Sequence, residues 1–560
     1  MDGSFEKKDM RFPRLTLLIA VLVVAASAVA QDSAPAATFD QVVDRVMERE
    51  AQFNKNLRKY NPLVETYIQN MKPDKELGAV PESDRYFLGR MSYQGKVDQK
   101  SFVDENKPSF FSKTYRKMTG FMRVDYLPLG FAQMVLVDGR GLDRAHYDFN
   151  FVRREFLGEI RTIVIDVTPK PKAGAGRFLG RIWVEDQDYN IVRFNGTYEQ
   201  GKKGVYLHFD SWRLNMAPGL WLPAYVYSEE SGVQVNMFSS LHFKSQTRLW
   251  GYNVSNAAHQ SEFTQVVVDT NDSVKDQSQN VQDLSPIASQ RAWESQAEEN
   301  VVERLQRASL LAAPGEVDKV LQTVINNLEI TNNLNVEPEI KCRVLMTAPL
   351  ETFTIGHTIV ISRGLLDTLP DEATLAAVLA HELAHVVLGH RLDTRYAFSD
   401  RMLFSDELTF QRFNLQHPAA DEDAADKKAF ELLQNSPYKD KLQSVGLFLR
   451  QLEARRASLP NLIRARLGNP MFEQKDNVRL ERLVAGSPEL APRDVKQIAA
   501  LPLGGRIKVD PFNNEVEISK NKPVAILSAR EKMPFEVTPM FPYLTRLSAA
   551  GAKPASVDGQ

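Results

Sequence analysis

His381-Glu382-Leu383-Ala384-His385 lies within an apolar run and predicts a buried helix from about Glu372 to Leu388. With about 3.6 residues per turn, positions four apart share one face of a helix, so the two imidazoles aim at one point with Glu382 beside them. Two nitrogen ligands, a carboxylate base and space for water are what a catalytic zinc ion requires. The sequence therefore predicts one Zn²⁺ per chain, bound by His381 and His385, with Glu382 as the catalytic base.

The third ligand is expected from a second helix, because the residues just after His385 exclude one class of zinc peptidase. A metzincin would carry glycine and histidine where this chain has Leu388 and Arg391. His390 lies about 140° around the helix from His385. We therefore interpret His390 as a helix-end or surface residue.

The second helix is predicted to open at His417-Pro418, with proline at a tolerated first-turn position and acidic residues following. Glu422 is the expected third ligand. Asp426, four residues on, is expected to accept a hydrogen bond from the free ring nitrogen of His381, which would fix its tautomer. A solvated acidic turn is the alternative interpretation, and two other carboxylates compete for the ligand role: Asp421 and Glu431.

This part of the chain resembles the HtpX-like and CAAX prenyl protease family of zinc endopeptidases, metallopeptidase family M48. The agreement spans about residues 300–485 and combines Gly364-Leu365-Leu366, Leu375–Val386 and Glu422-x-x-x-Asp426. The resemblance implies a mainly helical, gluzincin-type zinc peptidase domain with a small sheet. It also implies that His381, His385 and Glu422 bind zinc and that Glu382 is the base.

The chain departs from this family at one place. Family members often carry Thr-His-Pro before a helix of the pattern Arg-Ile-x-x-Leu, whereas here Asn469-Pro470 precedes Val478–Leu483. Asn469 would then stand where the family has a helper histidine. Asn469, or else Arg464 or Arg466, is a candidate donor to an oxyanion, and a simple turn residue is the alternative interpretation of Asn469.

The first half of the chain has a different pattern. Apolar residues recur at helical spacing from about Phe39 to Tyr60, and short runs rich in Val, Ile and aromatic residues follow between about Tyr86 and Val268. This predicts a mostly antiparallel β-rich domain with an N-terminal helix. Gly180–Asp186 followed by Ile191–Arg193 weakly resembles a β-hairpin of periplasmic lipoprotein-carrier proteins, and a β scaffold for the catalytic domain is the alternative interpretation.

The N-terminus predicts export. Basic residues precede an apolar run from Leu15 to Ala30 that ends in Ala28-Val29-Ala30, as in a secretory signal peptide. Cleavage near Ala30 would give a periplasmic or secreted protein, and a membrane tether formed by an uncleaved signal anchor is the alternative.

Bulk composition limits the partners. With 69 basic and 71 acidic residues the net charge is −2, so no nucleic-acid partner is expected. The single cysteine, Cys342, excludes an intrachain disulfide and is interpreted as a small core residue.

The predicted fold class is α+β. The expected divisions are a signal peptide (1–30), a β-rich domain (39–268), a linker (269–290), a peptidase domain (291–490), a small β-containing appendage (491–547) and a disordered tail (548–560).

The leading functional hypothesis is an exported zinc metalloendopeptidase that cleaves proteins or peptides in envelope quality control, with membrane-proximal proteins or lipoproteins among the candidate substrates. The alternative is a non-catalytic carrier or chaperone for lipoproteins or lipids that retains a peptidase-like zinc domain.

Overall fold

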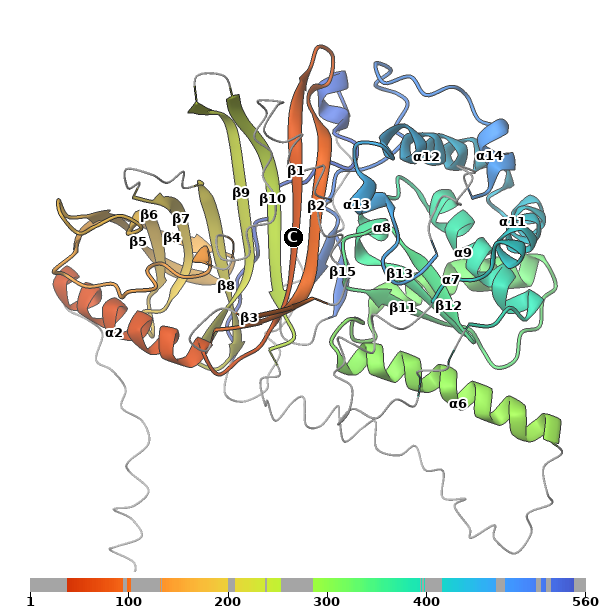
Figure 1. Cartoon of the computed structure of the whole chain (residues 1–560), viewed down its shortest axis with the longest axis horizontal. Helices are drawn as coiled ribbons and strands as arrows, with labels where there is room; N and C mark the ends of the chain where they lie inside the picture. Colours follow the sequence, from red (N-terminus) through yellow and green to blue (C-terminus); the bar gives the residue numbers. More distant parts are fainter. Residues whose placement is uncertain are drawn as a thin grey trace, which may run out of the picture.

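The computed structural model describes residues 38–93, 98–101, 131, 133–199, 207–236, 239–252, 286–392, 394, 397, 415–469, 479–509, 515–519 and 525–547. The predicted signal peptide, most of the predicted linker and the predicted tail lie outside these residues. Strands fill the first half and helices with a small sheet fill the second (Figure 1). The predicted α+β class is confirmed.

One antiparallel sheet dominates the first half. Within the described part of the chain it has ten strands in the order β3-β2-β1-β10-β9-β8-β7-β6-β5-β4. The order follows the chain except where β1 pairs with β10, which joins the first hairpin to the last strand. The strands are β1 (Leu63–Asp74), β2 (Gly78–Ser92), β3 (Asp98–Ser101), β4 (Tyr147–Leu157), β5 (Ile160–Pro169), β6 (Phe178–Glu185), β7 (Ile191–Tyr198), β8 (Phe209–Ala217), β9 (Leu220–Asn236) and β10 (Ser239–Trp250).

Helix α2 (Phe39–Leu57) packs its apolar residues with one face of this sheet in a shared core. Thr38 begins the helix with a capping box, in which its hydroxyl accepts from the Gln41 amide and the Gln41 side chain accepts from the Thr38 amide. A buried ion pair also joins the helix to β8, because Glu50 accepts two hydrogen bonds from Arg213 at 2.7 and 2.8 Å.

The second half places helices around a small sheet. Strand β13 lies in the middle of that sheet, parallel to β11 and antiparallel to the edge strand β12. The strands are β11 (Lys341–Leu345), β12 (Thr352–Ile355) and β13 (Thr358–Ser362). The helices are α6 (Pro286–Arg307), α7 (Glu316–Thr331), α8 (Arg363–Thr368), α9 (Glu372–Leu388), α11 (Ala419–Gln434), α12 (Leu442–Arg455), α13 (Pro460–Ile463) and α14 (Glu481–Ala485), with 3-10 turns η2 (Lys439–Lys441) and η3 (Ala529–Lys532).

The sequence from Phe353 to Ser362 predicts a single strand, and this prediction is wrong. The segment is a hairpin, because Gly356 adopts a positive φ of 57° and the chain reverses between β12 and β13. The reversal makes β12 an edge strand of the small sheet, directly beside helix α9. The sequence from Arg506 to Ile518 predicts a hairpin. Its two arms do pair, as β14 (Ile507–Val509) with β15 (Val516–Ile518).

The two halves meet through buried polar side chains. Glu65 of β1 lies 3.2 Å from the Arg363 guanidinium and accepts hydrogen bonds from the Tyr86 hydroxyl and the Ala348 amide. Glu65 and Arg363 are each 1% exposed. Since a buried charge without a partner is costly, this pair fixes how the β-rich sheet sits against the helical half.

Glu65→Ala is expected to lower the free energy of unfolding by about 3–5 kcal/mol, because it leaves the Arg363 charge buried and unpaired. Urea unfolding of the whole chain measures the loss. The control is Asp44→Ala, which breaks an exposed pair with Arg144 (2.8 Å, side chains 59% and 43% exposed). Asp44→Ala should change stability by less than about 1 kcal/mol, and an equally small effect of Glu65→Ala would show that the buried pair does not hold the halves together.

The C-terminal segment 525–547 returns to the β-rich sheet, which the sequence did not predict. The Gln69 side chain bonds the backbone of Phe535 and Val537. Farther along, Leu544 accepts from the Glu159 amide and Arg546 pairs with Glu185 at 2.5 Å. The segment therefore ties the helical half to the sheet a second time. Among the described residues, no helix is long and apolar enough to span a bilayer.

Candidate metal centre

Helix α9 carries the motif through the core of the second half. Asp371 caps its first turn by accepting from the Thr374 amide at 2.8 Å, and Gly389 ends it with a left-handed φ of 71°. Its bounds, Glu372–Leu388, are those that the sequence predicts. Every residue from Ala373 to His385 is buried, so His381, Glu382 and His385 lie inside the protein.

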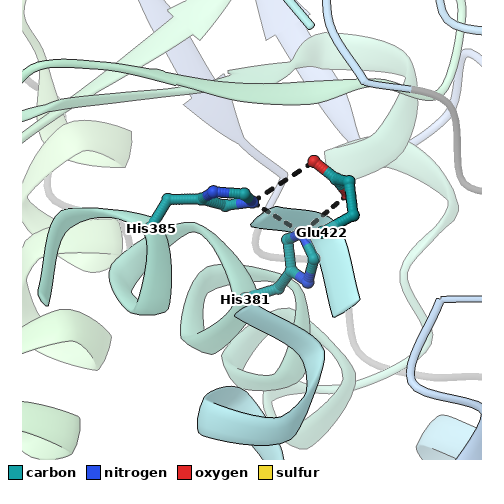
Figure 2. A group of neighbouring side chains, drawn as sticks. All are labelled: His381, His385 and Glu422. Atoms are coloured by element: carbon teal, nitrogen blue, oxygen red, sulfur yellow. Dashed lines mark hydrogen bonds and ion pairs between the residues drawn. The ribbon is translucent and has the colours of Figure 1, made fainter. Parts of the chain in front are cut away.

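Helix α11 brings the third side chain. It begins after Pro418, and Glu422 in its first turn is 7% exposed. Glu422 Oε2 lies 3.3 Å from His381 Nε2, and Glu422 Oε1 lies 3.3 Å from His385 Nε2. The two histidine Nε2 atoms are 3.1 Å apart. Figure 2 shows the three side chains pointing toward one another.

These distances fit a tetrahedral zinc site. Ligand atoms about 2.0–2.2 Å from a tetrahedral ion lie roughly 3.3–3.6 Å from one another, close to the spacings found here. A second observation supports a metal: buried Glu422 Oε1 meets the geometric criteria of no hydrogen bond among the described residues, and its 3.3 Å ion-pair contact is with His385 Nε2, itself a candidate ligand atom. Three ligands and a free fourth position are the composition of a catalytic rather than a structural zinc site.

Both ligand histidines are oriented through their other ring nitrogen. Asp426 Oδ1 lies 2.7 Å from His381 Nδ1, the contact that the sequence predicts. His390 Nδ1 lies 2.9 Å from His385 Nδ1, so His390 does more than end the helix. Burial and the nearby Arg479 charge lower the pKa of His381, but its hydrogen bonds to the Asp426 and Glu422 carboxylates outweigh both and raise the pKa to about 9. A proton therefore competes with a metal ion for His381 Nε2.

Asp426→Asn is expected to weaken zinc binding by about 10–100-fold, because the partner of His381 Nδ1 would no longer be a carboxylate. Competition with a zinc chelator measures the affinity. Asp423→Asn removes an exposed carboxylate from the same helix and serves as the control. Equal zinc affinities for the two variants would contradict the role given to Asp426.

Glu382 is fully buried and held by strand β12. The hydroxyls of Thr352 and Thr354 donate to its two oxygens at 2.5 and 2.7 Å. Burial raises the pKa of Glu382, but the nearby positive charges of His381 and Arg479 outweigh this effect and lower it below the ordinary value. The carboxylate is therefore ionised and ready to accept a proton.

Arg479 is a site residue that the sequence analysis missed. Its Nη1 lies 3.5 Å from Glu382 Oε1 and its Nε lies 3.1 Å from Glu422 Oε2, and the residue is 4% exposed. This charge also holds the pKa of Glu422 well below its usual range, against the effect of burial. A signal was present, because Arg479 stands at the arginine of the family's Arg-Ile-x-x-Leu pattern, which reads Arg479-Leu480-x-x-Leu483 here.

The structure does not bring Arg466 to the metal ligands. Its side chain donates to Asn461 and lies 5.6 Å from the Tyr86 ring, on the side of the β-rich sheet. Arg464 is exposed. Asn469 does lie near the site, because it forms an isolated β-bridge with Thr352 and accepts from the His417 amide at 2.7 Å.

The competing carboxylates do not join the ligand cluster. Asp421 Oδ1 lies 3.9 Å from His390 Nε2, and Glu431 pairs with Lys428 at 3.2 Å. His417, predicted only to open the helix, instead stacks on His385 with ring centroids 4.0 Å apart. Burial lowers the pKa of His417 to about 4, so its imidazole is neutral.

A small apolar pocket lies beside the metal ligands. Its cavity volume is about 10 Å³, which is room for about one water molecule. It lies between α9 and α12, and its lining is formed by Thr374, Ala377, Val378, His381, Val445, Phe448, Leu449, Arg479 and Leu480. Since His381 and Arg479 also belong to the metal centre, a water molecule in this pocket would lie beside that centre.

Comparison with solved structures gives weak likenesses. A LolA superfamily protein from Nitrosomonas europaea is 12% identical and covers 41% of this chain and 97% of its own, with a TM-score of 0.21. A putative outer membrane lipoprotein-sorting protein domain from Vibrio parahaemolyticus is 11% identical and covers 40% and 98%, with a TM-score of 0.18. TM-scores this low support no argument about function. No curated protein matches this chain.

Comparison with protein families gives a match to Peptidase family M48 over residues 312–411. The matched range contains β12, the whole of α9 and the His381–His385 motif, and it ends before Glu422. A metallopeptidase domain is thereby indicated. The resemblance that the sequence motif predicts is confirmed for this segment: residues 312–411 match the model of Peptidase family M48.

Proposed function

We propose that this protein is a zinc-dependent metalloendopeptidase with Glu382 as its general base. The observation that carries the proposal is the convergence of His381, His385 and Glu422 on one point, with one ligand atom of each within 4.8 Å of the others. A buried, ionised carboxylate lies beside that point. Neither a structural zinc site nor a buried polar cluster needs such a base.

Zinc, when bound, would polarise a water molecule and the scissile carbonyl. Glu382 would take a proton from the attacking water and deliver it to the nitrogen of the leaving amine. Thr352 and Thr354 orient this carboxylate by donating to both of its oxygens. Arg479 adds a fixed positive charge beside Glu382 and Glu422, which stabilises the negative charge that gathers there.

The substrate is proposed to be an extended peptide that pairs with the edge strand β12. Within the described residues this strand pairs with β13 on one side, and on its other side Thr352 is bridged to Asn469. The peptide would pair with the part of this edge beyond the bridge, where Thr352 and Thr354 bring the strand against the base.

The cellular setting is part of the same proposal. The basic and apolar segment before Gln31 supports export with cleavage near Ala30, and a membrane tether is the alternative. We place the enzyme in envelope protein quality control, with misfolded, membrane-proximal or lipoprotein chains as substrates. The β-rich half would hold or select them.

The experiment measures zinc content and cleavage of a permanently unfolded protein, reduced and carboxymethylated lactalbumin. We expect one zinc ion per chain and cleavage that a chelator stops and added zinc restores. A wild-type protein without zinc would overturn the ligand assignment. Bound zinc without cleavage would favour a carrier or chaperone that retains a peptidase-like domain.

A further inference from the structure

His417 is a buried histidine whose ring has no polar partner in the described part of the chain. The residue is 8% exposed, and neither Nδ1 nor Nε2 has a hydrogen-bond partner there. Buried polar groups are almost always hydrogen-bonded, because leaving one unpaired costs about 1–3 kcal/mol. An imidazole with two unpaired nitrogens therefore calls for a group that is not part of the described chain.

The ring lies at the metal centre. It is parallel to the His385 ring within 13°, with centroids 4.0 Å apart. Its backbone amide is fixed by Asn469 Oδ1 at 2.7 Å, and Asn469 itself bridges to Thr352 of β12. His417 is thus held between a metal ligand and the edge strand proposed to bind substrate.

The stacking of the two rings argues against His417 as a fourth metal ligand. The lone pairs of parallel rings lie in separate parallel planes, so His417 cannot aim at the point where His385 Nε2 meets His381 and Glu422 unless the stack breaks. The other three ligand atoms already converge without it. A nitrogen at this place is suited to bond an oxygen atom beside the metal instead.

We propose that His417 is a catalytic residue that donates a hydrogen bond to the oxygen of the scissile peptide group. This inference rests on the proposed peptidase function and adds a donor to it. As water attacks, the carbonyl oxygen gains negative charge, and the ring N–H bonds that charge more strongly than it bonds the ground-state carbonyl. The ring keeps its proton throughout, while Glu382 carries the proton from water to the amine. Asn469 acts as a positioning residue by holding the backbone of His417.

The test uses the zinc-loaded full chain with His417→Phe, which keeps an aromatic ring against His385 and removes both nitrogens. We expect kcat to fall by about 100-fold, as for loss of one oxyanion donor, with KM and zinc affinity changed by less than about 3-fold. His417→Gln restores an N–H donor and should recover part of kcat. Affinity for a phosphinic peptide, a tetrahedral mimic of the charged intermediate, should fall with kcat in His417→Phe, while affinity for the product peptides should not.

The outcomes separate this inference from the proposed function. A wild-type protein that cleaves nothing would overturn both. A wild-type enzyme whose kcat and phosphinic-peptide affinity survive His417→Phe would overturn the role of His417 alone. A variant that loses zinc or melts early would show that the ring only packs on His385, and a failure of His417→Gln to exceed His417→Phe would point the same way.

Discussion

Glu382→Gln is expected to leave the protein folded and zinc-loaded while lowering kcat/KM for peptide cleavage by about 10²–10⁴-fold, the contribution of a positioned general base. Glutamine is nearly isosteric, and its amide keeps an oxygen that can accept from Thr352 or Thr354. What it cannot do is accept a proton from water at neutral pH. Since Glu382 is not among the three converging ligands, zinc should stay bound.

Zinc content and cleavage of the unfolded substrate, measured on the same sample, check this result. Glu431→Gln is the control, because Glu431 is an exposed carboxylate on α11 (63%) that pairs with Lys428 outside the metal centre. Cleavage at the wild-type rate by Glu382→Gln would remove Glu382 from the mechanism. Loss of zinc from this variant would instead show that the carboxylate helps to bind the ion.

The parts of the structure that the sequence predicts well are those set by local rules. The bounds of α9 follow from a cap at Asp371, a continuous apolar run and a glycine at position 389. The approach of Glu422 and Asp426 to the histidines follows from spacing of four on α11. Such patterns depend only on residues within a few helical turns of one another, so a single sequence is enough to predict them.

The parts that the sequence does not predict depend on contacts between distant segments. Arg479 reaches Glu382 across 97 positions, and although it stands in the stretch that matches the family pattern, spacing along the chain does not show that its side chain meets Glu382. His417 was predicted as a helix opener, and its stacking on His385 appears only when α9 and α11 are packed. The reversal at Gly356 was missed because the β-propensity of its neighbours continues on both sides of it.

Asn469 shows how the two kinds of information combine. The sequence places it where relatives carry a histidine, which suggests a lost function. The structure places His417 beside the metal centre and makes Asn469 the residue that holds its backbone. The metal centre therefore does have a neighbouring imidazole, and it comes from His417 instead of from position 469.

Glu422→Ala is expected to weaken zinc binding by more than about 100-fold, because loss of a residue that only supports a ligand already costs up to about 100-fold. Cleavage should fall to background when the zinc concentration equals the protein concentration. The variant removes one of three ligands and leaves the two imidazoles without a carboxylate to balance the ion. It also removes the nearest partner of Arg479 Nε, at 3.1 Å, so some loss of stability is expected even without metal.

A comparison of melting temperatures with and without chelator separates these two effects. Zinc stabilises only the form that binds it, by about 2.7 kcal/mol at a free concentration 100 times Kd, so the wild-type protein should melt earlier when zinc is removed. Glu422→Ala should melt at the same temperature with and without chelator. That temperature is expected to be lower than for the wild-type protein, because Arg479 has lost its partner. Asp421→Ala, one residue away and outside the cluster, should keep the wild-type shift. A zinc-dependent shift in Glu422→Ala as large as that of the wild-type protein would assign the third ligand to another residue.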